Sequence, residues 1–331
     1  MNRKRIAKRA VIIILIVLVI AFCGVIMGDK AALKDFFENS SSAFAIPDIG
    51  KGFIPQGIAY DKETDCFFLT GYMGNGKDSP IYAVRRTDGQ TVKKVTMLTE
   101  NGEKFKGHAG GVSGYGSSLY IAGSTDACMY EFPVESVLNA EDGSRLAAER
   151  NIRLRTAGDF IRVSFTSCDD RFLYAGEFHK GFIFYTDKSH MVEEDGVTQK
   201  AYLFGFTPDE KGKAVPGCVF SIPDSIQGAC FADGYVYLSK SRGLLCGSVL
   251  SFNLDKLTPA GTKTVLGREV PLYILSENSA GKVTTVPPMC EEIAAADGKL
   301  YIIFEAASNR YLIGKAMGLD KVYAVPAGYF Q

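Results

Sequence analysis

The residues of this chain that could do chemistry are polar side chains at the ends of short apolar segments. Carboxylates, amides, a histidine and two cations recur there, and such groups can move protons, hold a cation or orient a polar ligand. These residues are Gln56, His108, Arg162, Glu177, Gln227, Lys240, Glu291, Glu292 and Glu305. Tyr72 also closes a second segment, and Asn75, His179 and Arg242 lie just beyond. Glutamates held close together can have their pKa values pushed apart, which lets one site supply both an acid and a base.

The apolar segments themselves repeat along the chain. An aromatic residue followed by a small or apolar run occurs five times, at steps of 52, 54, 63 and 64 residues. The five anchors are Phe68, Tyr120, Tyr174, Tyr237 and Tyr301. A second short segment begins ten residues before most anchors and twelve before the first. Repeats of this length, built from short strands, are typical of a β-propeller.

Each repeat is predicted to contain four strands, which in the first repeat are 57–60, 66–70, 81–85 and 92–98. Third strands are predicted from the tetrapeptides IYAV, MYEF, FIFY, VLSF and VYAV, which begin at residues 81, 129, 182, 249 and 322. Asp-Gly pairs such as Asp233-Gly234 and Asp297-Gly298 supply the positive φ angles that tight hairpins need. We expect an all-β protein of five blades, or of six if 201–223 or 259–288 contains another hairpin.

The last repeat ends at Gln331 without room for a full outer strand. Segment 42–47 is a candidate closing strand, which would tie the ends of the propeller together and leave no open edge. In a propeller, the starts of inner strands and the ends of second strands gather at one face. We therefore expect the polar residues to surround one channel mouth, the usual shape of a small-molecule site. The other interpretation is that they solvate the channel mouth and pair with one another, since propeller channels are wet.

The N-terminal region carries a membrane signal. Residues 10–28 contain no charge, and nineteen helical residues span about 28 Å, close to the roughly 30 Å of a bilayer core. Five basic residues precede this run, so the positive-inside rule places residues 1–9 in the cytoplasm and the rest outside. A cleaved signal peptide is the rival interpretation, and bulky Phe22 disfavours a lipoprotein at Cys23. We expect a single-pass anchor at 10–28, a stalk at 29–46 and the propeller at 47–331.

Charge and cysteine content argue against several classes of function. Without the five N-terminal cations, 32 basic residues stand against 37 acidic ones and no basic stripe stands out, so no nucleic-acid partner is expected. No Cys-x-x-Cys pair occurs and the three histidines lack metal-ligand spacing, so no metal site is predicted, although a divalent cation such as calcium could bind the glutamates. A Cys246–Cys290 disulfide is predicted, which an extracytoplasmic location would permit. His190 is predicted to be solvated in a polar turn.

The openings Gln56-Gly57-Ile58 and Gln227-Gly228-Ala229, and the Asp-Gly-x-apolar-Tyr steps at 233–237 and 297–301, resemble bacterial secreted β-propellers in general. Five-bladed plant-type glutaminyl cyclases open with Phe-Thr-Gln-Gly, where this chain has Ile54-Pro55-Gln56-Gly57, but the Glu-containing motif of that family does not follow. The metal-ligand pattern of the six-bladed gluconolactonase and strictosidine-synthase-like group is also not visible. The resemblance implies a propeller across 47–331 and carries over no catalytic residue.

Together these patterns predict a membrane-anchored, extracytoplasmic β-propeller whose mouth binds a small polar ligand or a component of the cell envelope. The alternative is a propeller enzyme, namely a hydrolase, lyase or cyclotransferase that uses the glutamates of the mouth. His108 would then be a second proton carrier, while Lys240 and Arg162 would neutralise negative charge. A third possibility is a purely structural propeller in an assembly, which would expose an apolar patch on a blade edge.

Overall fold

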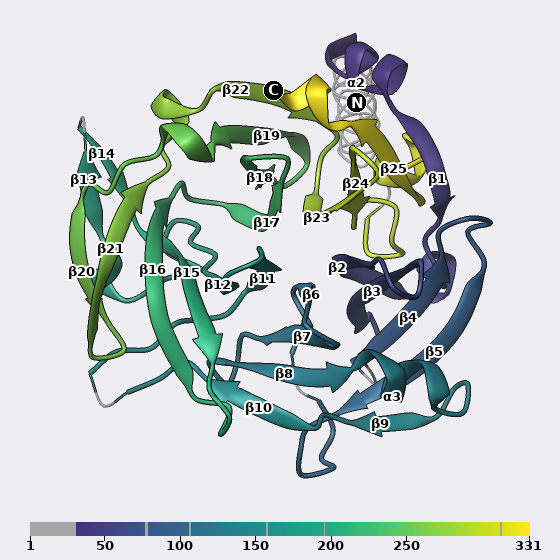
Figure 1. Cartoon of the computed structure of the whole chain (residues 1–331). Coiled ribbons are helices and arrows are strands. Elements are labelled where there is room, and N and C mark those ends of the chain that lie inside the picture. Colours follow the sequence, from purple (N-terminus) through teal and green to yellow (C-terminus); the bar gives the residue numbers. More distant parts are fainter. Residues whose placement is uncertain (1–30, 77–78, 106, 157, 195, 312) are drawn as a thin grey trace, which may run out of the picture.

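The computed structural model describes residues 31–331 except 77–78, 106, 157, 195 and 312. Five main antiparallel sheets surround a central axis, and each sheet places its first strand nearest that axis (Figure 1). The predicted five-bladed β-propeller is therefore confirmed.

Three blades show the four-stranded plan most simply. The first contains β2 (Phe53–Asp61), β3 (Cys66–Met73), β4 (Pro80–Arg85) and β5 (Thr91–Leu98), to which β9 (Arg145–Ala147) adds a parallel edge strand. The second contains β6 (Val112–Tyr115), β7 (Ser118–Gly123), β8 (Cys128–Pro133) and β10 (Arg150–Arg153). The fourth contains β17 (Ile226–Ala232), β18 (Tyr235–Arg242), β19 (Leu245–Asn253) and β22 (Lys282–Val286). Each sequence repeat therefore supplies the inner strands of one blade, while an edge strand can come from the next repeat.

The third blade is larger than the others. Its first four strands are β11 (Phe165–Cys168), β12 (Leu173–Gly176), β15 (Ala201–Pro208) and β16 (Ala214–Ile222). A hairpin of β20 (Gly261–Val265) and β21 (Arg268–Ile274) joins this sheet, because β21 pairs in parallel with β16. A separate hairpin, β13 (Val192–Glu194) with β14 (Val197–Gln199), lies in the connection between β12 and β15. Segment 201–223 thus supplies β15 and β16 of the third blade, and 259–288 supplies its added hairpin and the outer strand of the fourth blade, so the six-bladed alternative is wrong.

One predicted strand is also wrong. Residues 182–185 form an exposed turn rather than the third strand of the third blade. That place is taken by β15, which pairs with β12 and sets Leu173 opposite Phe206. Both segments are apolar and aromatic, so periodicity alone cannot choose between them. The segment that the neighbouring blades bury becomes the strand.

The fifth blade joins the two ends of the described chain. It contains β23 (Cys290–Ala296), β24 (Lys299–Phe304) and β25 (Lys321–Pro326). Its outer strand is β1 (Ser41–Ala45), which comes from the segment where the sequence predicts a closing strand and pairs antiparallel with β25. Ahead of β1, helix α2 (Lys34–Asn39) packs Phe36 against Phe304 and Tyr323, with ring centroids 6.3 and 6.0 Å apart.

The remaining helices are short. They are α3 (Val134–Asn139), α4 (Ile313–Ala316) and 3-10 turns at Ile49–Lys51, Lys188–His190, Leu254–Lys256, Glu277–Ser279 and Ala327–Phe330. In the described part of the chain, no helix has the length and apolar character needed to cross a membrane. The predicted anchor at 10–28 lies outside the described residues.

The core lies between neighbouring blades. Successive side chains of a strand point to opposite faces of its sheet. Phe67 accordingly packs toward the fifth blade, with its ring centroid 4.4 Å from that of Tyr301, while Phe68 belongs to the cluster shared with the second blade. Cys290 is a buried free thiol of this core, so the predicted disulfide with Cys246 is wrong.

Candidate functional site

Three inner strands begin with the same irregularity. A β-bulge interrupts the register of β2 after Pro55, of β17 after Ile226 and of β23 after Cys290. A bulge breaks the alternation of a strand and re-aims the side chain that it carries. The residues at these bulges are Gln56, Gln227, Glu291 and Glu292. The bulges therefore gather four polar side chains where the inner strands start.

The glycine after each glutamine has no room for a side chain. A Cβ on Gly57 would lie 2.4 Å from the Thr70 hydroxyl and 2.8 Å from the backbone nitrogen of Val112. A Cβ on Gly228 would lie 2.6 Å from the Cα of Glu292. Inner strands of neighbouring blades thus approach closely at this level. The Gln-Gly openings follow from this geometry, because the glutamine is the bulged polar residue and the glycine permits the approach.

Glu291 and Glu305 form the acidic centre of the mouth. Gln227 Nε2 donates to Glu291 Oε1 at 3.3 Å, and Gln56 Nε2 donates to Glu305 Oε2 at 3.1 Å. Burial raises the pKa of Glu291 well above its ordinary value, and the charge of Glu305 raises it further. Burial also raises the pKa of Glu305. Neither carboxylate has an ion pair within 4.0 Å among the described residues.

Two tyrosines, a histidine and an arginine border this acidic pair. The Tyr72 ring stacks on His108 with centroids 4.5 Å apart, and Arg310 Nη1 donates to Tyr72 Oη at 2.6 Å. Partial burial and then the charge of Arg310 lower the pKa of His108, so its ring is neutral near pH 7. The Tyr311 hydroxyl and the Arg310 charge offset part of the rise in the pKa of Glu305. The mouth is therefore acidic at its centre and aromatic at its border.

Arg310 and Tyr311 are mouth residues that sequence reasoning does not find. They lie in the connection from β24 to β25, which is sixteen residues long, whereas the connection from β3 to β4 has six. Long connections on a rigid scaffold often carry functional residues. The length of the β24–β25 connection is the sequence feature that could have pointed to these two residues.

Glu292 occupies the channel below the mouth. It is 1% exposed, and its Oε2 accepts the backbone N–H groups of Ile58 and Val112, both at 2.9 Å. Burial raises the pKa of Glu292 well above its ordinary value, and these hydrogen bonds offset part of the rise. The side chain ties the inner strands of the first, second and fifth blades together. A cavity of about 130 Å³ next to it is lined by all five inner strands, and Gln56, Glu291 and Glu305 do not line that cavity.

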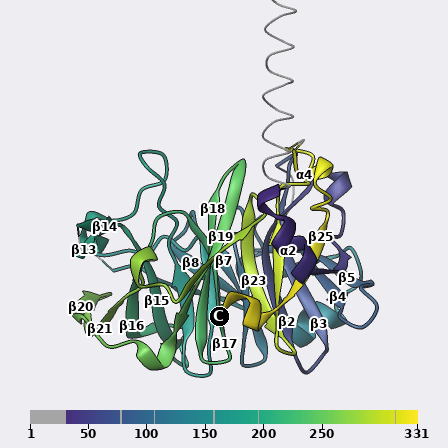
Figure 2. The same cartoon turned by 90° about the horizontal axis from the view of Figure 1, so that it is seen from above.

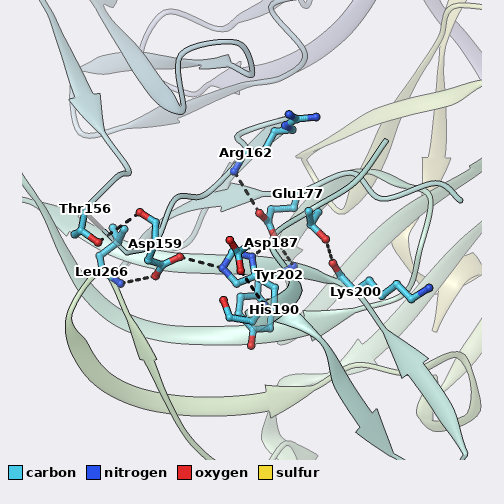
Figure 3. A network of polar contacts seen from close by, with 11 residues as sticks. Thr156, Asp159, Arg162, Glu177, Asp187, His190, Lys200, Tyr202 and Leu266 are labelled. Atoms are coloured by element: carbon cyan, nitrogen blue, oxygen red, sulfur yellow. Dashed lines mark hydrogen bonds and ion pairs between the residues drawn. The ribbon is translucent and has the colours of Figure 1, made fainter. Parts of the chain in front are cut away.

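Glu177 lies apart from the acidic pair, in a buried network of the third blade (Figure 3). Its carboxylate accepts the backbone N–H groups of Arg162 at 3.2 Å and Tyr202 at 3.1 Å. His190 Nδ1 lies 2.8 Å from the same carboxylate, and His190 Nε2 lies 3.1 Å from Asp159 Oδ1. Glu177 is fully buried, so these groups satisfy a carboxylate that water does not reach.

His190 is the cation of this network. Burial by itself would lower its pKa, but the hydrogen bonds to Asp159 and Glu177 raise it to about 9. The ring is 2% exposed and stacks on Tyr202 with centroids 4.5 Å apart, so the prediction of a solvated His190 is wrong. Asp159 also accepts the backbone N–H of Leu266 at 2.9 Å. The network therefore fastens three connections of the enlarged third blade to one another.

The other predicted cations have neighbours of their own. Lys240 forms an ion pair with Glu277, and the Arg162 guanidinium lies 4.8 Å from the centroid of the Tyr185 ring. At the mouth itself the structure brings together Gln56, His108, Gln227, Glu291 and Glu305. No group of three or more His, Cys, Asp or Glu side chains that could hold a metal ion is found in the described part of the chain.

The strand topology thus defines a five-bladed β-propeller with an acidic mouth. No family model matches the sequence, and no curated protein matches it. Solved structures similar to this chain include the Myxococcus xanthus glutaminyl cyclase, at 14% identity and a TM-score of 0.42 over 76% of this chain and 85% of that chain. Another is BamB from Moraxella catarrhalis, at 11% identity and a TM-score of 0.34 over 82% and 84%. These likenesses concern the fold alone, and the propeller assignment rests on the strand topology of this chain.

Proposed function

We propose that this protein is held in the membrane by residues 10–28 and that its extracytoplasmic propeller binds a small ligand through an ammonium group. Glu291 and Glu305 carry the proposal, because these two neighbouring carboxylates share the mouth without an ion-pair partner among the described residues. A positively charged ligand stabilises such carboxylates most, because an opposite charge favours their ionised form.

Two neighbouring amides can also offer acceptors. Since an ionised carboxylate only accepts hydrogen bonds, Gln56 and Gln227 turn their N–H groups toward the glutamates. Their carbonyl oxygens then remain available to accept from a ligand. Tyr72 and Tyr311 add aromatic rings beside Glu305. Arg310 already lies 5.6 Å from the centroid of the Tyr311 ring, which shows that a cation can sit against an aromatic ring here. Donor-rich ammonium groups therefore fit this mouth better than anionic ligands.

One observation favours a second candidate function, an acid–base enzyme. Burial raises the pKa of Glu291 well above its ordinary value, which favours the protonated carboxyl that a general acid needs. Partial burial lowers the pKa of His108, so its imidazole can act as a base in the same range. Such a site would suit a hydrolase, lyase or cyclotransferase whose substrate has an amino group.

Calorimetric titration of the full chain in lipid nanodiscs tests the binding proposal. The probes are small primary amines, each matched with an alcohol of the same shape. We expect the amines to bind, and we expect Glu305→Gln and Glu291→Gln to weaken that binding at least tenfold. Glu63→Gln is the control, since Glu63 is an exposed carboxylate in the turn between β2 and β3. Equal binding of amines and alcohols, or unchanged binding in both glutamate variants, contradicts the proposal.

The enzyme candidate needs a separate measurement. Amine-bearing esters, amides and N-terminal glutaminyl peptides are incubated with the wild type and with His108→Gln. Turnover that rises with pH and is lost in His108→Gln supports catalysis. Amine binding without turnover leaves the binding function standing and removes the enzyme.

A further inference from the structure

Large apolar side chains stand in water on one loop of the third blade. Phe182 is fully exposed, Ile183 is 78% exposed and Tyr185 is 60% exposed, in a turn that follows β12. Phe184 packs edge-on to Phe178, with ring centroids 5.3 Å apart, which supports the base of the turn. Consecutive exposed apolar residues are costly in water and mark interaction sites.

A second apolar tip lies beside this turn. Leu244 and Leu245 are 50% and 59% exposed at the end of the β18–β19 hairpin. The two tips are neighbours, because a Cβ on Gly243 would lie 3.7 Å from Lys180 Nζ. Second strands β12 and β18 both end at the mouth face, so both tips project from that face. We call this surface the apolar tips, defined as residues 182–185 with Leu244 and Leu245.

Basic side chains surround the apolar tips. Lys180 lies at the base of the first turn, where its backbone pairs with Phe184. The Arg162 guanidinium lies 4.8 Å from the centroid of the Tyr185 ring, and Arg242 ends β18 next to the second tip. Glu277 is the acidic neighbour, and it pairs with Lys240 and lies 3.9 Å from Arg242. Aromatic and aliphatic side chains among Lys and Arg match the boundary of a bilayer, where the apolar parts enter and the charges stay with the headgroups.

The place where the chain enters the fold also points to a bilayer as the partner. The apolar run ends at Gly28, and Leu33 is already buried in the core of the fifth blade. Five residues span at most about 18 Å, so the start of α2 lies close to the end of the run. Figure 2 shows α2 and α4 on the side toward which the β18–β19 hairpin extends. A bilayer crossed by 10–28 therefore lies next to the mouth face.

We propose that the apolar tips insert into the surface of the bilayer and hold the mouth face against it. This proposal rests on the proposed anchor at 10–28, and it adds a second contact that fixes the orientation of the propeller. The occupant of the surface is the lipid bilayer, with the basic side chains favouring anionic headgroups.

The chain contains no tryptophan, which allows a single fluorescent reporter. Ile183→Trp is placed in the full chain, reconstituted in vesicles of phosphatidylcholine and phosphatidylglycerol with or without brominated acyl chains. Val283→Trp is the matched control, since Val283 is 50% exposed on the outer strand of the fourth blade. We expect brominated lipid to quench the indole fluorescence of the Ile183→Trp chain at least twofold and to leave that of the Val283→Trp chain unchanged.

Flotation and quenching together distinguish insertion of the apolar tips from insertion of the anchor. Vesicle flotation reports whether the full chain incorporates, and a chain that fails to float contradicts both the anchor and the tips. An Ile183→Trp chain that floats and is not quenched overturns the proposal while the anchor stands, which is the result expected if the tips serve a protein partner. Replacing Phe182, Phe184 and Leu245 with Ser in the reporter chain should abolish quenching without changing flotation.

Discussion

Glu177 and Glu305 occupy equivalent places, directly after the second strands of the third and fifth blades, yet their surroundings differ. Glu177 is fully buried and contacts His190, whose pKa is raised to about 9. Glu305 faces a second glutamate and receives an amide hydrogen bond from Gln56. The first carboxylate has a buried cation beside it, whereas the second has another glutamate beside it and no ion pair within 4.0 Å among the described residues, although the charge of Arg310 offsets part of the rise in its pKa. The same residue type thus stabilises one blade and prepares a site in another.

The buried network and the acidic mouth should respond differently to substitution. A buried charge with a matched partner is costly to disturb, because removing the partner leaves the other charge uncompensated. Two carboxylates at a mouth oppose folding at a pH above their ordinary pKa, because both tend to ionise and repel one another. A cation that binds between them offsets this repulsion. Substitutions in the two regions should therefore have opposite effects.

The largest effect is expected from His190→Ala. This change leaves Glu177 and Asp159 without their buried cation and should lower the unfolding free energy by about 3–5 kcal/mol. Urea unfolding measures it. Asp88→Asn in the exposed Arg85–Asp88 pair is the control, and it should change stability by less than about 1 kcal/mol. Equal effects of the two changes would show that the network is not a stabilising centre.

The contribution of His190 should also depend on pH. Its folded pKa of about 9 lies above the ordinary value of 6.5. The stabilisation is therefore fully present below about pH 6.5 and is lost as the pH rises through about 9. We expect the difference in unfolding free energy between the wild type and His190→Gln to shrink from pH 6 to pH 10. A difference that stays constant over this range would mean that His190 is neutral in the folded protein.

The fold can be predicted from the sequence because each blade is a local repeat. The aromatic anchors give the blade count, and the Gln-Gly openings locate the bulges that place Gln56 and Gln227 at the mouth. The sequence does not reveal that Glu177 and Glu305 have different roles, because the partner of Glu177 lies in an insertion. His190 lies thirteen residues further on, in the connection that also contains the exposed turn at 182–185. Its second partner, Asp159, precedes β11 in another connection, and no local pattern links the two.

A smaller effect is expected at the bulge of the first blade. Gly57→Ala forces a Cβ against Thr70 and the backbone of Val112, and it should cost about 1–3 kcal/mol by overpacking. It should also weaken amine binding, since Gln56 precedes it in the bulge. Gly114→Ala is the matched control in β6, where the nearest atom would lie 4.0 Å away. Calorimetric unfolding measures the difference, and equal stability of the two variants would contradict the close approach of the inner strands.

The smallest effect is a gain of stability from Glu291→Gln. Burial raises the pKa of Glu291, so the wild type loses stability as the pH rises above the ordinary range of a glutamate. The neutral amide should raise the unfolding free energy by about 1–2 kcal/mol at pH 8, and the gain should fade toward pH 4. Urea unfolding at both pH values checks this, with Glu63→Gln as the exposed control. A less stable Glu291→Gln at pH 8 would mean that the carboxylate is compensated.

The most direct test of the contrast between the two regions is a side-by-side thermal unfolding of Glu177→Gln and Glu305→Gln, with and without a bound amine. A ligand at 100 times its Kd adds about 2.7 kcal/mol to the stability of a competent site. We predict that Glu177→Gln melts several degrees below the wild type and keeps the amine-dependent rise in Tm. Glu305→Gln should melt at or above the melting temperature of the wild type and lose that rise. The reverse pattern, or loss of both properties in both variants, would contradict the division between a stabilising network and a binding mouth.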